Sequence, residues 1–107
     1  SKKRRKVRVS KPEEFHTSNG TTVLVGKNNL QNDRLSFKIA NKNDIWLHVK
    51  DIPGSHVIIR DSDPDEQTLL EAAQLAAYFS KGRNSDNVPV DYLPAKRLSQ
   101  MVLSPVL

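Results

Sequence analysis

The sequence predicts an α+β fold, in which a small mixed or antiparallel sheet carries one long Ala-rich helix and one short helix. Two observations support this class. β-branched and aromatic residues gather in short segments such as TTVLV (21–25) and IWLHV (45–49), as they do in strands. Residues 62–82 instead repeat apolar residues at helical spacing. With 107 residues and 36% apolar residues, the chain fits one domain with a modest core and no large buried active-site cavity.

The first predicted element is a hairpin that follows Pro12. Phe15 belongs to its first strand, Asn19-Gly20 supplies the turn with positive φ, and residues 21–25 form the second strand. Upstream, the alternating residues 6–9 (KVRV) predict the start of another strand.

Residues 30–44 (LQNDRLSFKIANKND) fit two patterns. The alternating apolar positions from Leu35 to Ile39 are typical of a strand, while the same residues with their neighbours also fit a helical stripe. Capping residues favour the helix, because Asn32 or Asp33 can accept hydrogen bonds from a first turn and residues 41–43 tolerate a left-handed stop. The prediction is a short helix over 33–41.

Two strands follow around a Pro-Gly turn, in a stretch that holds the only tryptophan and two of the three histidines. In the first strand, residues 45–49, Trp46 and His48 share one face and the remaining apolar residues share the other. The second strand is HVIIR (56–60).

Residues 61–82 predict the long helix. Ser62 or Asp63 is the expected cap, Pro64 falls in the first turn, and Lys81 lies near the C-terminal end before Gly82. A stripe that can lie close to a sheet is formed by Leu69, Ala72, Ala73, Ala76 and Phe79. A short strand, VPVDY (88–92), comes next, and no firm period follows Tyr92.

Charge is segregated along the chain. Seven of the seventeen basic residues lie in the first eleven positions, and the remaining ten bases face twelve acids. Residues 23–60 carry six bases and three acids, whereas residues 61–80 carry five acids and no base. A fold that keeps this segregation has a cationic face suited to a polyanion such as RNA. The run Lys2, Lys3, Arg4, Arg5 and Lys6 fits either a charged linker or an arm that contacts phosphates.

Several function classes lack support. The chain has no cysteine, which excludes disulfides and thiolate metal sites and fits a cytoplasmic protein. Its apolar runs are far too short for membrane insertion. GxxxxGK[ST], GxGxxG and GxSxG are all absent, so the usual nucleotide-binding and hydrolase hypotheses have no motif support.

The histidines allow two further readings. His48 and His56 could approach each other and bind a metal with Asp44 or Asp51, but their spacing does not force convergence, so no metal site is predicted. Pairing Ser55 with either histidine would need an orienting carboxylate that the sequence does not indicate. Histidines that bond to turn backbone are the commoner situation.

The segment GKNNLQND (26–33) is rich in amides. Its Asn and Gln side chains, beside Lys27, can line a phosphate or base pocket, or they can support their own backbone as Asn-rich turns often do. Trp46 also allows two interpretations: it could stack against an unpaired base, or it could anchor the core. A lone tryptophan in a strand favours the core.

Three motifs carry a resemblance: VLVGKNNLQND (23–33), DIWLHVKDIPGSHVII (44–59) and EAAQLAAYFSKGRNSDNVPVDY (71–92). Their order and content resemble the NFACT-R domain, the C-terminal RNA-binding domain of the bacterial RqcH proteins, which are also called fibronectin-binding proteins, and of their Rqc2 and NEMF relatives. The resemblance covers about residues 3–97. It implies a domain without catalytic residues that contacts transfer RNA and the large ribosomal subunit in ribosome-associated quality control. Fibronectin, or another host matrix protein, is the alternative partner that the bacterial name suggests.

The family's motif positions fall on Gly26, Asp33, Asp44, Trp46, Gly54 and Ser55, and on several of the predicted site residues. The predicted RNA-binding set is Lys27, Asn28, Asn29, Gln31, Asn32, Arg34, Lys38, His48 and His56. We expect the cations and the arm to meet phosphates, and the Asn-rich loop and the histidine-bearing turn to share one solvent-facing patch. The predicted organisation is a basic arm over 1–11, the NFACT-R-like domain over 12–97 and an atypical segment over 98–107. In that last segment we expect a final family strand to be either missing or substituted, which would leave an open sheet edge with Val102 and Leu103 as apolar neighbours.

Overall fold

A computed structural model describes residues 10–101 of the chain. Three expectations therefore lie outside the described residues: the phosphate-contacting arm over 2–6, the strand start over 6–9, and the open edge near Val102 and Leu103. Within residues 10–101, no helix combines the length and apolar character needed to cross a bilayer.

Five strands form one antiparallel sheet, which confirms the predicted α+β class. The strands are β1 (Glu13–His16), β2 (Thr22–Val25), β3 (Ile45–Val49), β4 (Val57–Ile59) and β5 (Val90–Pro94). Their order across the sheet is β1-β2-β4-β3-β5, and every neighbouring pair is antiparallel. The helical elements are α1 (Asn29–Arg34), its π-helical continuation η1 (Leu35–Ile39), α2 (Glu66–Tyr78) and α3 (Lys96–Met101).

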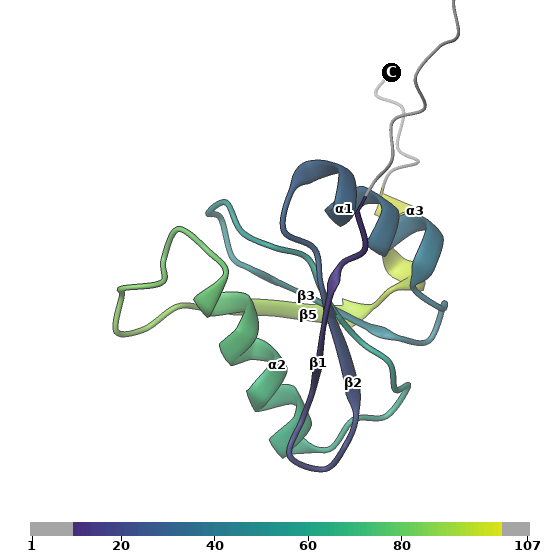
Figure 1. The fold of residues 1–107 in the computed structure, drawn as a ribbon, viewed down its shortest axis with the longest axis horizontal. Coiled ribbons are helices and arrows are strands. Elements are labelled where there is room, and N and C mark those ends of the chain that lie inside the picture. Colours follow the sequence, from purple (N-terminus) through teal and green to yellow (C-terminus); the bar gives the residue numbers. More distant parts are fainter. Residues whose placement is uncertain (1–9, 102–107) are drawn as a thin grey trace, which may run out of the picture.

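Helix α2 covers one face of the sheet, while α1, η1 and α3 lie on the other (Figure 1). Alternation along the strands supplies both cores. One core joins strand residues to Ala72 and Ala76 of α2, and its strand members are Val23, Val25, Leu47, Val57 and Ile59. The other core packs Leu24, Ile58 and Trp46 against Leu35 of η1. Because β4 is central and covered on both faces, all three of its residues are apolar and buried.

The predicted hairpin is confirmed as β1 and β2, with His16 opposite Thr22. Gly20 has φ +87°, as the Asn-Gly signal requires. The side chain of Asn19 donates to Asp65 and Thr68 at distances of 3.1 and 2.9 Å. The hairpin tip is therefore tied to the start of α2.

The predicted helix over 33–41 begins too late, and its predicted caps are wrong. The helix starts at Asn29 and is capped by Asn28, whose side chain accepts from the backbone of Gln31. Asn32 lies inside the helix and bonds to another part of the fold. The end is also different: Ala40 is extended, and among the described residues no asparagine has positive φ.

Helix α2 confirms the predicted stripe but not the predicted cap. Asp65 is the N-cap, with its carboxylate accepting from the backbone of Thr68 at 2.8 Å. Pro64 therefore precedes the helix, and the predicted caps Ser62 and Asp63 lie further upstream. The helix ends at Tyr78, so Lys81 belongs to the loop beyond it.

The end of the described chain is more ordered than its lack of period indicated. Strand β5 pairs with β3 over Val90–Pro94, and α3 follows with Ala95 and Leu98 buried. The predicted boundary between residues 97 and 98 falls inside α3.

Candidate nucleic-acid interface

A cleft of about 470 Å³ opens beside the start of α1. It lies between three segments of the chain, and its lining is Lys27, Asn28, Asn29, Asn32, Pro53, Gly54, Ser55, Tyr78, Phe79, Ser80, Lys81 and Arg83. Three of these residues are cations and none is an acid. We call this surface the cationic cleft.

The cleft forms because Gly26 lets two segments approach. A Cβ at Gly26 would lie 2.3 Å from Oδ1 of Asn32, so no larger residue fits without displacing that side chain. The same Oδ1 accepts from the backbone N–H of His56 at 3.1 Å, and the N–H of Gly26 donates to the carbonyl of His56 at 3.0 Å. These bonds hold the Asn-rich loop beside the segment that leads into β4.

The third wall comes from the residues after α2. Gly54 bridges Ser80, the N–H of Ser55 donates to the carbonyl of Phe79, and the N–H of Lys81 donates to the carbonyl of Pro53. A Cβ at Gly54 would lie 2.9 Å from Cγ2 of Val49 and 3.0 Å from Cβ of Ser80, which explains the glycine. This pairing is what carries Lys81 and its neighbours to the cleft.

Most amides of the Asn-rich loop have structural roles. Asn28 caps α1, while Gln31 accepts from the N–H of Lys27 at 2.8 Å and donates to Oγ of Ser10 at 2.6 Å. Gln31 is 6% exposed and Asn32 is 9% exposed. The expectation that these two amides face solvent is wrong, because both residues are buried and each side-chain oxygen accepts a hydrogen bond from a backbone N–H, Gln31 from Lys27 and Asn32 from His56. Asn28 and Asn29 remain exposed at the cleft.

The three cations of the cleft differ in their partners. Lys27 pairs with Glu13 at 2.7 Å, and its ammonium lies 5.8 Å from the centre of the Phe79 ring. The guanidinium of Arg83 lies 4.1 Å from the centre of the Tyr78 ring and donates to the phenol oxygen at 2.8 Å. Lys81 is exposed. Sequence reasoning did not include Tyr78, Lys81 or Arg83 in the site, although a lysine and an arginine around Gly82 were a signal.

Arg34 and Lys38 do not join the cationic cleft. They line a separate surface hollow of about 430 Å³ together with Asp33 and Phe37, on α1 and η1. The structure thus divides the predicted set between two surfaces.

The histidines form a third group, around Trp46. The ring centres of His48 and His56 are 5.6 Å apart, and each lies within 6 Å of the Trp46 ring at 5.8 and 5.5 Å. The expected approach of the two histidines is confirmed, but neither lines the cationic cleft, so the predicted patch is not contained in that one cleft.

Neither alternative chemistry of the histidines has a geometric basis. Nδ1 of His56 lies 2.6 Å from Oγ of Ser36, so the hydroxyl beside this ring is not that of Ser55. Over residues 10–101, no three side chains of the His, Cys, Asp or Glu type gather as metal ligands. Trp46 packs against the core, as predicted, and its Nε1 is buried without a hydrogen-bond partner in the described structure.

Acid should destabilise this region through His56. Burial lowers the pKa of its imidazole below the ordinary 6.5, and nearby His48 lowers it further, while Asp33 and a hydrogen bond to Asn32 act in the opposite direction. Below pH 6.5 the unfolded chain gains a proton that the folded chain does not yet bind, so stability falls as the pH drops toward the folded pKa. Between about pH 7.5 and 5.5, we expect the free energy of unfolding to fall less in His56→Gln than in the unsubstituted chain, as measured by urea titration. An equally steep loss in the variant would contradict this origin.

Comparison with known proteins gives a consistent picture. The family model described as the NFACT protein RNA binding domain matches residues 11–104. The sequence is 56% identical over 88 residues to the Rqc2 homolog RqcH of Bacillus subtilis, which covers 82% of this chain and 15% of that protein. It is 57% identical over 90 residues to the Rqc2 homolog RqcH of Streptococcus suis, covering 82% and 16%.

A solved structure agrees with the fold. It is the C-terminal part of the fibronectin/fibrinogen-binding protein from Streptococcus suis, which matches with a TM-score of 0.82 and 52% sequence identity. The match covers 87% of this chain and 39% of that one. The chain therefore spans only a small part of the length of the curated relatives it matches, 15% and 16% for the two named here.

Proposed function

The chain belongs to the family of NFACT RNA-binding domains, and on that basis we propose that its cationic cleft holds the phosphate backbone of transfer RNA or ribosomal RNA. The longer protein would be a cytoplasmic ribosome-associated quality-control factor that acts on stalled large ribosomal subunits. In this role the domain binds and positions RNA, and it carries no catalytic step and no cofactor.

The charge of the cleft carries the proposal. Lys27, Lys81 and Arg83 converge on one surface whose lining contains no carboxylate. Such a surface attracts phosphates by charge, independently of base sequence. The ion pair of Lys27 with Glu13 is no obstacle, because exposed pairs contribute only about 0–1 kcal/mol and a phosphate can replace the carboxylate.

The RNA test uses Lys81→Gln and the matched control Lys42→Gln, which removes another exposed lysine that lies outside the cleft. We expect Lys81→Gln to weaken binding of labelled transfer RNA about 2- to 5-fold. It should also reduce the steepness of log affinity against log salt by about 0.7–0.9, because one phosphate contact is lost. Fluorescence anisotropy over a salt series measures both quantities.

Two outcomes would reject this assignment. One is a chain that binds neither transfer RNA nor ribosomal RNA at physiological salt, and the other is an equal effect of the two substitutions. In the full-length protein, Lys81→Gln should also lower co-sedimentation with purified large ribosomal subunits more than Lys42→Gln does.

A second candidate function is binding of fibronectin, after which the structural neighbour is named. No feature of the cleft favours it over RNA. Saturable binding of a fibronectin fragment, with no RNA binding under the same conditions, would support this alternative.

A further inference from the structure

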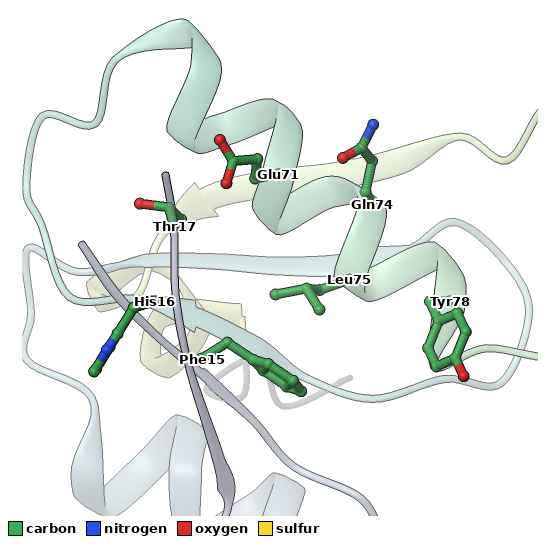
Figure 2. Close-up of a pocket in the computed structure, with 7 residues that line it drawn as sticks. All are labelled: Phe15, His16, Thr17, Glu71, Gln74, Leu75 and Tyr78. Carbon is green, nitrogen blue, oxygen red and sulfur yellow. The ribbon is translucent and has the colours of Figure 1, made fainter. Parts of the chain in front are cut away.

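A second cleft shares one lining residue, Tyr78, with the first. It has a volume of about 390 Å³ and opens between β1 and α2. We call it the β1–α2 cleft, and its residues are Phe15, His16, Thr17, Glu71, Gln74, Leu75 and Tyr78. In Figure 2, Phe15 and Leu75 lie between the strand and the helix, with Tyr78 at one end and Glu71 and Thr17 at the other. The cleft thus has an apolar, aromatic end and a polar end.

Tyr78 connects the two clefts because it lines both. Tyr78 is exposed, with 49% of the residue accessible to solvent. The ring is held in place by an edge contact with Phe79, at 4.9 Å between centres, and by the guanidinium of Arg83 above it. An exposed aromatic ring fixed beside a cationic groove is the arrangement on which proteins stack unpaired bases.

The two clefts differ in their charged residues. The β1–α2 cleft is lined by one carboxylate, that of Glu71, and by no lysine or arginine, whereas the cationic cleft is lined by three cations and no acid. Glu71 accepts hydrogen bonds from the backbone and hydroxyl of Ser18 and from Gln67, and these bonds lower the pKa of its carboxyl group, which keeps it ionised. A phosphate is therefore repelled from this cleft, while a neutral aromatic group is not.

We infer that the β1–α2 cleft receives one unpaired nucleobase of the RNA whose backbone crosses the cationic cleft, with Tyr78 as the stacking surface. The inference rests on the proposed function and specifies its ligand as single-stranded RNA. Arg83 and Lys81 hold a phosphate on one side of Tyr78, and the attached base turns to the other side against Phe15 and Leu75. The exposed amide of Gln74 offers a donor and an acceptor to the edge of the base.

The test compares a short single-stranded RNA with a blunt duplex of the same sequence. Tyr78→Leu keeps apolar volume but removes the ring, Tyr78→Phe keeps the ring but removes the hydroxyl, and Leu70→Ala removes an exposed apolar residue of the same helix outside both clefts. Tyr78→Leu should weaken single-strand binding about 5- to 150-fold, as expected for one lost base stack. Tyr78→Phe and Leu70→Ala should stay within about 2-fold, and duplex binding should change little in all three.

Salt dependence separates this inference from the proposed function. Tyr78→Leu removes no positive charge, so its salt slope should stay close to that of the unsubstituted chain, in contrast to Lys81→Gln. Thermal unfolding of each variant controls for folding. If Lys81→Gln weakens RNA binding while Tyr78→Leu does not, or if Tyr78→Leu weakens duplex and single strand equally, the base site is wrong and the cationic cleft stands. If no RNA binds at all, both are wrong.

Discussion

Gly26→Ala is expected to lower the free energy of unfolding by about 2–4 kcal/mol, which combines overpacking with the loss of a buried hydrogen bond. The new Cβ would meet Oδ1 of Asn32 at 2.3 Å and the backbone of Asn32 at 3.0 Å. The side chain of Asn32 accepts a hydrogen bond from the backbone N–H of His56, and Asn32 can move only if this bond breaks. Urea titration at neutral pH measures the change.

A double-mutant cycle shows whether the clash is the cause. Asn32→Ala alone should lower the free energy of unfolding by about 1–3 kcal/mol, because the backbone N–H of His56 loses the side-chain oxygen that accepts its hydrogen bond. In the Asn32→Ala background the side-chain clash is absent, so Gly26→Ala should cost clearly less than in the unsubstituted chain. Strict additivity of the two changes would show that the close approach of Gly26 and Asn32 does not stabilise the fold.

Asp44→Ala is expected to cost about 2–4 kcal/mol of unfolding free energy. Its carboxylate is 7% exposed, accepts from Nη1 of Arg60 at 3.0 Å and from the N–H of Asn41 at 2.9 Å. Arg60 also donates to the carbonyl of Ile39 at 3.0 Å. Removing the carboxylate leaves a guanidinium that is only 31% exposed without its counter-charge, and it opens the turn between η1 and β3.

The matched control is Asp86→Ala, which removes the same charge from an exposed loop position and should change stability by less than about 0.5 kcal/mol. Asp44→Asn keeps an acceptor for the N–H of Asn41 but loses the charge, so its cost should lie between those of the two alanine variants. Equal costs for Asp44→Ala and Asp86→Ala would show that the ion pair with Arg60 contributes nothing to the fold.

The parts of the fold that sequence patterns predicted well are those in which local spacing reports burial. Alternation assigned Trp46 and His48 to one face of β3, and helical spacing identified the α2 stripe that contains Ala72 and Ala76. The start of α1 was predicted wrongly because several neighbouring residues can cap a helix equally well. Asn28 is the cap, because the side chain of Asn32 instead accepts a hydrogen bond from the backbone of His56. No local sequence pattern reveals that contact.

The candidate site was predicted only in part, for a similar reason. The amide-rich segment 26–33 directed attention to Lys27, Asn28 and Asn29, which do line the cationic cleft. The hypothesis that cations meet phosphates also grouped Arg34 with them, but successive positions of a helix point in different directions, and Arg34 lines another hollow. Lys81 and Arg83 were missed because they reach the cleft through the bridge of Gly54 and Ser80, which joins distant parts of the chain.

The sequence by itself determined the α+β class, the strand faces, the hairpin, the helix α2 and the family, because periodicity, turn residues and motif order are local properties of the chain. The tertiary structure alone decided which amides are exposed, which cations share a surface, and that Tyr78 lines both the cationic cleft and the β1–α2 cleft. Those properties depend on contacts between segments that are far apart in sequence. Only the folded chain determines which side chains are needed as hydrogen-bond partners for the backbone at these contacts.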